Sequence, residues 1–161
     1  MNGQNVFSRR SLIIVAGAAS LGALAGRATA APTSGVASIK IYKDPGCGCC
    51  EAWVDHLKGA GFKADVEERT DMADLKERLG VPTELASCHT GVINGYVIEG
   101  HVPAADIKRL VATRPVGKGL AVPGMPVNSP GMEVPGEPNE RYTVWLFQGD
   151  GKRTAFSQHG G

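Results

Sequence analysis

Three of the four cysteines in this chain lie in one four-residue stretch, Cys47-Gly48-Cys49-Cys50, at the junction of a predicted strand and a predicted helix. Residues 38–42 alternate apolar and polar side chains, as a half-buried strand does, and residues 43–46 contain the Pro and Gly of a turn. The helix is predicted by apolar residues at helical spacing, which are Trp53, Val54, Leu57 and Ala60. Thiols at a helix N-terminus face free backbone N–H groups, which lower their pKa. The stretch therefore predicts a metal site or redox thiols.

The first thirty residues are predicted to be an export signal. Ser8-Arg9-Arg10-Ser11-Leu12 resembles a twin-arginine signal, and the weakly apolar run that follows, residues 12–26, is too short to span a bilayer. Ala28-Thr29-Ala30 fits a small-x-small cleavage pattern, so we expect cleavage after Ala30, a short linker over residues 31–37 and one domain over residues 38–157. An uncleaved N-terminal anchor is the alternative. The expected location is the periplasm, with no stable membrane anchor.

The charge balance excludes one class of partner. The whole chain has 17 Lys and Arg against 16 Asp and Glu, and cleavage would remove three arginines and no acidic residue. The expected mature chain then has a net charge of −2, derived from those counts. Because no basic field remains, no nucleic-acid partner is expected.

Export would place the four cysteines in an oxidising compartment, where structural disulfides are common. Adjacent Cys49 and Cys50 cannot easily pair with each other. An inert Cys47–Cys50 or Cys49–Cys88 disulfide is the structural alternative to a metal site.

The rest of the pattern predicts an α/β fold. Residues 62–66 alternate like a second strand, Asp71 can cap a second helix, Asn94-Gly95 marks a hairpin, and Pro103 suits the start of a third helix. The resulting order, β-α-β-α-β-β-α, is similar to that of thioredoxin-like domains. In that arrangement the segment before the hairpin lies beside the first helix. Cys88 and His89 should then approach the Cys47–Cys50 turn.

Residues 115–138 contain six Pro and five Gly, which argues against a helix or a central strand. We therefore expect a long Pro/Gly-rich loop, and long loops are usually functional or disordered. Residues 142–147 and 153–156 flank Gly149-Asp150-Gly151 and predict a C-terminal β-hairpin.

Several short motifs together resemble one known family, the domain of unknown function 411, described as predicted metal-binding proteins. They are Lys43-Asp44-Pro45-Gly46-Cys47-Gly48-Cys49-Cys50, Leu85-Ala86-Ser87-Cys88-His89-Thr90, Tyr96-Val97-Ile98-Glu99-Gly100-His101-Val102-Pro103, Gly119-Leu120-Ala121-Val122-Pro123-Gly124-Met125-Pro126 and Ser129-Pro130-Gly131-Met132-Glu133. The resemblance implies an exported, thioredoxin-like protein tied to metal handling, with copper as the metal.

The predicted metal ligands begin with the sulfurs of Cys47, Cys49, Cys50 and Cys88. Thiolates and thioethers select Cu(I), and zinc is the rival because four thiolates also make a closed zinc site. His89 adjoins Cys88, and it is predicted either to bind the metal or to hold the thiolate by a hydrogen bond.

Met125 and Met132 each follow Pro-Gly in the loop, and their thioethers could close a Cu(I) site over the cysteines. The alternative for both is gap-filling packing. His101 is as well suited to capping or packing as to ligation. His56 is expected to be solvated, and His159 to lie in a disordered tail. Trp53 and Trp145 are assigned to packing.

The sequence therefore predicts an exported soft-metal protein that handles copper for delivery or tolerance. Its partners would be the metal ion and a periplasmic copper protein. The competing hypothesis is a thiol-disulfide oxidoreductase, in which Cys47 or Cys49 attacks and Cys50 or Cys88 resolves the mixed disulfide. An interaction module with inert disulfides is the third.

Overall fold

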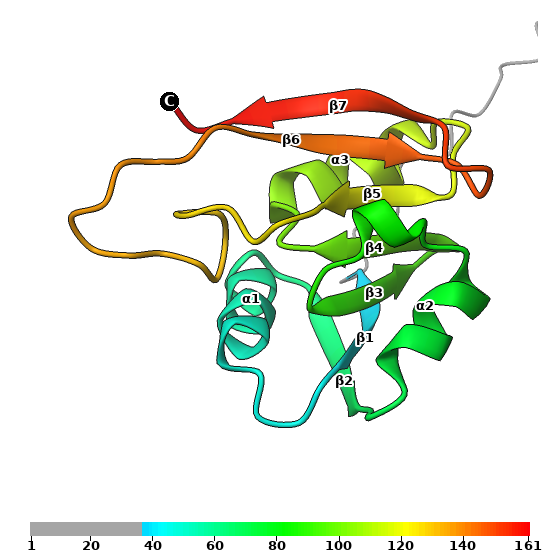
Figure 1. Ribbon diagram of the computed structural model, residues 1–161, viewed down its shortest axis with the longest axis horizontal. Coiled ribbons are helices and arrows are strands. Elements are labelled where there is room, and N and C mark those ends of the chain that lie inside the picture. Colours follow the sequence, from blue (N-terminus) through cyan, green and yellow to red (C-terminus); the bar gives the residue numbers. More distant parts are fainter. Residues whose placement is uncertain (1–36) are drawn as a thin grey trace, which may run out of the picture. The chain divides into compact units, whose positions relative to one another are not determined.

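The computed structural model describes residues 37–161 of the chain (Figure 1). The predicted export signal and nearly all of the predicted linker lie outside the described residues. The helices are α1 (Gly48–Gly59), α2 (Met72–Leu79) and α3 (Ala104–Thr113), with a short 3-10 helix η1 (Thr83–Leu85). Across residues 37–161, no helix is both long enough and apolar enough to cross a membrane.

Seven strands form one mixed sheet in the order β2-β1-β3-β4-β5-β6-β7. They are β1 (Ser38–Lys43), β2 (Lys63–Glu68), β3 (His89–Ile93), β4 (Tyr96–Gly100), β5 (Gly119–Val122), β6 (Tyr142–Phe147) and β7 (Arg153–His159). β1 pairs with β2 in parallel and with β3 antiparallel, and β3 and β4 form the hairpin predicted at Asn94-Gly95. The predicted α/β class and the order β-α-β-α-β-β-α from β1 to α3 are confirmed. The likeness to thioredoxin-like domains stays a prediction.

The expectation that residues 115–138 contain no central strand is wrong. β5 lies between β4 and β6, parallel to β4 and antiparallel to β6. All four of its residues are buried, and a continuous apolar run is usual for a strand covered on both faces. Gly119 is suited to its place because a Cβ there would collide with the backbone of Val97. The glycine that suggested a loop is therefore what permits close strand pairing.

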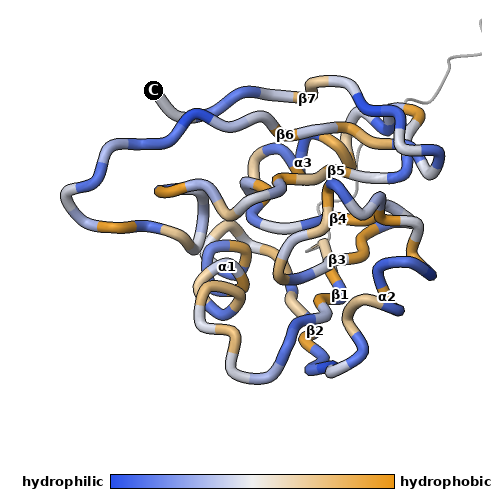
Figure 2. The backbone as a smooth tube through the Cα atoms, in the orientation of Figure 1, coloured by the Kyte–Doolittle hydropathy of each residue, from blue (hydrophilic) through white to orange (hydrophobic). Residues whose placement is uncertain are grey.

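The sheet is covered on both faces. One core cluster joins β1, β3, β4 and β5 to α1 and α3 and includes Trp53, Ile98 and Leu120. The second cluster lies on the opposite face and includes Val97 and Ala121 with residues from and beside α2 and η1. Successive strand residues thus alternate between the two clusters, as the pleat requires. Many of the hydrophobic stretches in Figure 2 lie along these central strands.

The predicted C-terminal hairpin is present as β6 and β7. His159, which we expected to lie in a disordered tail, is instead the last residue of β7. Its ring stacks on Tyr142 with 5.3 Å between centroids, and its Nε2 lies 2.6 Å from Asp106 Oδ2. These contacts tie the end of the chain to α3.

Candidate metal centre

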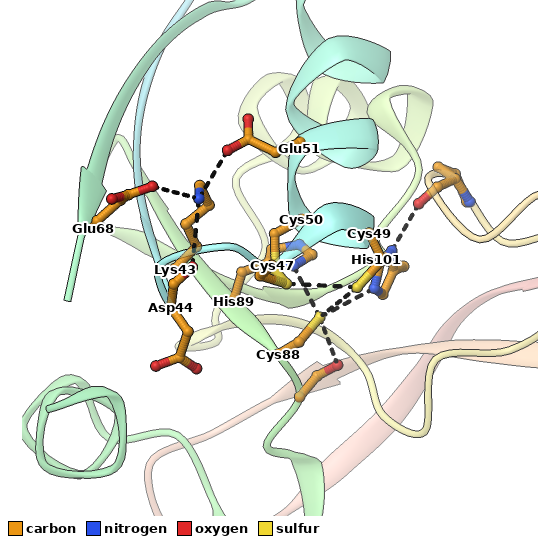
Figure 3. Close-up of a disulfide and its surroundings, with 12 residues drawn as sticks. Lys43, Asp44, Cys47, Cys49, Cys50, Glu51, Glu68, Cys88, His89 and His101 are labelled. Atoms are coloured by element: carbon orange, nitrogen blue, oxygen red, sulfur yellow. Dashed lines mark hydrogen bonds and ion pairs between the residues drawn. A yellow bond between two sulfur atoms is a disulfide. The ribbon is translucent and has the colours of Figure 1, made fainter. Parts of the chain in front are cut away.

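The cysteine turn is held in place by a buried lysine. The Cys47 N–H donates to the Asp44 carbonyl and closes the turn before α1. Lys43, at the end of β1, is 1% exposed, and its Nζ lies 2.8 Å from Glu51 Oε1 and 2.9 Å from Glu68 Oε1. These two ion pairs connect β1, α1 and β2 (Figure 3). They raise the pKa of Lys43, so its ammonium stays charged beside the turn.

Cys47 and Cys50 form a disulfide in this structure, and Cys49 and Cys88 are free. Cys50 is fully buried, whereas Cys47 and Cys49 are partly exposed. Cys49 is therefore the one clustered cysteine that is free in this structure. In this oxidation state Cys47 and Cys50 are not thiolates, so both become available as metal ligands only after reduction.

Cys88 occupies the centre of the site (Figure 3). Its Sγ lies 3.9 Å from Cys49 Sγ, 3.2 Å from His89 Nδ1 and 3.2 Å from His101 Nε2. Cys49 Sγ in turn lies 3.6 Å from Cys47 Sγ. The expected approach of Cys88 and His89 to the cysteine turn is thus present, although 39 residues separate Cys49 from Cys88.

His101 is oriented by the loop that follows β5. Its Nδ1 lies 2.8 Å from the Pro130 carbonyl oxygen, which can only accept a hydrogen bond, so Nδ1 carries the proton. Burial lowers the pKa of His101, which favours the neutral ring. The Nε2 lone pair then faces Cys88 Sγ. A histidine whose second nitrogen donates to a carbonyl is the arrangement usual for metal-binding histidines.

His89 is fully buried between Trp53 and His101. Its ring centroid lies 4.2 Å from that of Trp53 and 4.9 Å from that of His101. Burial holds the pKa of His89 well below its usual value, so the ring is neutral. His89 Nε2 is the one buried side-chain nitrogen or oxygen among the described residues that has no hydrogen-bond partner. Leaving such an atom unpaired costs about 1–3 kcal/mol, which an ordered water would offset. His89 Nδ1, and not Nε2, is the nitrogen that faces Cys88 Sγ.

The metal-free centre disfavours a thiolate at Cys88. Burial, with Cys49 alongside, raises the pKa of Cys88 to about 12. Cys88 is therefore a neutral thiol in the metal-free protein near neutral pH, and metal binding must release its proton.

The Pro/Gly-rich loop lies over the start of α1. A Cβ at Gly131 would come within 2.7 Å of Trp53 N and 2.8 Å of Cys49 O, so the loop backbone touches the first turn of the helix. Gly131 also has φ of 84°, a conformation that glycine adopts without strain. Met132 follows it and is half-buried, whereas Met125 is 44% exposed. The role of the two methionines as ligands stays a prediction.

Among residues 37–161, two groups of side chains place their ligand atoms within 4.8 Å of one another: Cys47, Cys49, Cys50 and Cys88, and Cys88, His89 and His101. Cys88 belongs to both. Five residues predicted from the sequence are therefore brought together. Sequence reasoning did not single out His101 as a ligand, and it missed Lys43 as the buried cation beside the turn.

His56 was expected to be solvated, and this expectation is wrong. Its Nε2 accepts a hydrogen bond of 3.1 Å from the Ala104 backbone N–H, the first residue of α3. Partial burial lowers the pKa of His56 below its ordinary value of 6.5, although Glu133 opposes the shift. The neutral ring thus links α1 to the beginning of α3.

This link predicts a pH dependence of stability. The unfolded chain binds a proton at His56 near pH 6.5, whereas the folded chain does so only at lower pH. The stabilisation is therefore complete above the unfolded pKa and is lost as pH falls through 6.5 toward the folded pKa. His56→Gln keeps an acceptor for Ala104 and does not titrate. Between about pH 7.5 and about pH 5.5 we expect the melting temperature of metal-free H56Q to fall less than that of the wild type. Equal falls in the two proteins would contradict the assignment.

Comparison with known proteins places this centre in a family. Residues 85–132 match the family described as "Protein of unknown function, DUF411". A solved structure titled "Copper resistance protein copG- Form 1" is 45% identical, with a TM-score of 0.74, over 79% of this chain and 100% of that chain. The chain belongs to the DUF411 family.

A second solved structure, titled "Copper resistance protein copG- Form 2", is 44% identical to this DUF411 chain, with a TM-score of 0.72, over 78% of this chain and 99% of that chain. A comparison with curated protein sequences finds no match. The stretch that matches the DUF411 description, residues 85–132, contains Cys88, His89 and His101 together with both loop methionines. The resemblance seen in the sequence motifs is confirmed.

Proposed function

We propose that this chain is an exported protein that binds copper as Cu(I) at the cysteine–histidine centre, for copper handling or tolerance in the periplasm. The convergence of Cys49, His89 and His101 on the Cys88 sulfur is the observation that carries the proposal. Soft sulfur donors select Cu(I), and neutral imidazoles also bind copper. Both similar solved structures are named as copper resistance proteins, which also supports copper as the metal.

Zinc is the rival metal, because thiolate and imidazole together also bind it tightly. Zinc sites are closed by four ligands in a fixed set, whereas two-coordinate or three-coordinate sulfur sites are sufficient for Cu(I). We therefore propose that Cu(I) displaces zinc from the reduced chain.

The Cys47–Cys50 disulfide makes the proposed binding dependent on redox state. Its reduction takes up two electrons and two protons and leaves two thiols, and metal binding then releases the thiol protons. Of its four cysteines, the oxidised chain offers two as thiol ligands, Cys49 and Cys88. The reduced chain offers four.

Competition with a chromophoric Cu(I) chelator tests the proposal. The mature protein would be reduced with a non-thiol reductant, freed of metal and titrated, and a sample with the disulfide intact would be titrated alongside. We expect the reduced protein to take Cu(I) from the chelator and the oxidised protein to bind at least about tenfold more weakly, about 1.4 kcal/mol. No uptake by the reduced protein from even a weak chelator would refute Cu(I) binding.

The disulfide also supports a second function, thiol-disulfide exchange. Cys47 and Cys50 form a disulfide with Cys-x-x-Cys spacing at the start of α1, and Cys47 is partly exposed. Cys49→Ser separates the two functions because Cys49 is not a member of the Cys47–Cys50 pair. For a metal centre, C49S should lower Cu(I) affinity by at least about tenfold. For an oxidoreductase, C49S should retain disulfide exchange while Cys47→Ser abolishes it, and that pattern with unchanged Cu(I) affinity would favour the second function.

We also propose that Met125 and Met132 contribute thioether ligands from the loop over α1. Met125→Leu combined with Met132→Leu keeps the side-chain volume and removes both sulfurs, so stability should change by less than about 1.5 kcal/mol. Cu(I) affinity should nevertheless fall in the chelator competition. If the double variant binds Cu(I) as the wild type does, the methionines are packing residues and cysteine and histidine make the whole centre.

A further inference from the structure

A buried ion pair lies directly behind the segment that carries Cys88. Glu99, on β4, has a fully buried side chain, and Lys76, on α2, reaches it with 2.6 Å between Nζ and Oε1. Lys76 Nζ also donates to Thr90 Oγ1 at 2.8 Å. A buried ion pair is weak evidence for a role in stability, because desolvation costs about as much as the attraction returns. The role of the Glu99 carboxylate is therefore inferred from its other hydrogen bonds.

Those contacts go to both sides of the Cys88–His89 dipeptide. Glu99 Oε1 accepts a 2.6 Å hydrogen bond from the Ser87 backbone N–H, and Glu99 Oε2 accepts one of 2.7 Å from Thr90 Oγ1. Thr90 and Glu99 are directly opposed in the β3–β4 pair, so the second contact follows from the hairpin register. One carboxylate thus holds the residue before Cys88 and the residue after His89.

The segment needs such a hold because it lacks regular structure. Residues 86–88 lie between η1 and β3 and belong to no helix or strand, so no strand ladder fixes the Ser87 backbone. Gly100, which follows Glu99, has no side chain and so leaves room for Ser87. A Cβ at Gly100 would come within 2.8 Å of Ser87 Cβ, and Gly100 has φ of 71°. The end of β4 therefore presents three consecutive residues to this segment, since His101 contacts Cys88 itself.

We propose that Glu99 is a positioning residue of the metal centre. Its carboxylate, with its charge balanced by Lys76, fixes Ser87 and Thr90 and so sets the place of Cys88 Sγ between His89, His101 and Cys49. The inference rests on the proposed Cu(I) binding. Hydrogen-bond partners behind metal ligands typically change metal affinity by about 10–100-fold when they are removed.

Two matched variants test this role. Lys76→Met with Glu99→Gln removes both charges and retains an oxygen that can accept from the Ser87 N–H. Lys76→Met with Glu99→Leu removes the same charges and provides no acceptor. In Cu(I) chelator competition we expect K76M/E99Q to stay within about threefold of the wild type and K76M/E99L to bind at least about tenfold more weakly. Equal Cu(I) affinity in both folded variants and the wild type would overturn the positioning role.

Cu(I) binding by the wild type distinguishes failure of this inference from failure of the proposed function. If the wild type binds no Cu(I), the proposed function fails. If it binds Cu(I) and the two variants bind equally well, only the role of Glu99 fails. Because K76M/E99L could fail to fold, amide exchange of the metal-free wild type gives a second test. The Ser87 N–H should exchange at least about tenfold more slowly than an unprotected loop amide, and exchange at the unprotected rate would refute the hold on Ser87.

Discussion

Replacing Cys88 by serine should lower the Cu(I) affinity of the reduced protein by at least about a hundredfold, roughly 2.8 kcal/mol. Cys88 belongs to both groups of candidate ligands, so its loss affects the cysteine set and the histidine set together. Serine is nearly the same size, but its hydroxyl is a poor ligand for a soft metal. Chelator competition on the reduced, metal-free variant measures the effect.

The control for Cys88→Ser is the fold of the variant itself. Cys88 is only partly buried, and in the metal-free protein it is a neutral thiol, so its replacement should leave the circular dichroism spectrum unchanged. A variant that is folded and binds Cu(I) within about threefold of the wild type would show that Cys88 is not a ligand.

Replacing Trp53 by alanine should destabilise the protein by about 3–5 kcal/mol. Trp53 is fully buried in the larger core cluster, its Nε1 donates to the Val102 carbonyl at 2.9 Å, and its ring covers His89. The change would remove a large buried ring and leave a cavity behind one side of the metal centre. Denaturant unfolding of the metal-free protein measures the loss.

Trp145 provides the matched control for that experiment. It lies on β6 and is only partly buried, and the guanidinium of Arg153 lies over its ring, 5.1 Å from the ring centroid. Trp145→Ala should therefore cost clearly less stability than Trp53→Ala. If the two substitutions lower the free energy of unfolding equally, the assignment of Trp53 to the centre of the core beneath α1 is wrong.

Much of the centre could be predicted from short-range patterns. The cysteine stretch falls between a strand pattern and a helix pattern, which puts Cys47 and Cys49 at the start of α1. The Asn94-Gly95 turn also carries information about His101. It sets the register that pairs Thr90 with Glu99, and continuing this register by two residues places Cys88 opposite His101. His101 could have been predicted as a partner of Cys88 on that basis.

Other features depend on contacts that no local pattern encodes. β5 was missed because a glycine such as Gly119 usually indicates a loop. Here it permits the close approach of the Val97 backbone, which the sequence does not reveal. The role of Glu99 requires the packing of α2, because Lys76 reaches it from a different element. The neutral state of His89 and its unpaired nitrogen follow from burial beneath Trp53 and not from its neighbours in the chain.

The most direct test of the proposed copper centre is the metal content and free-thiol count of the protein isolated without chelator from its proposed location, the periplasm. We expect copper in excess of zinc, and four thiols that react after the metal is removed under anaerobic conditions. Protein that carries no copper, and in which only Cys49 and Cys88 react because the Cys47–Cys50 disulfide persists, would contradict the metal centre.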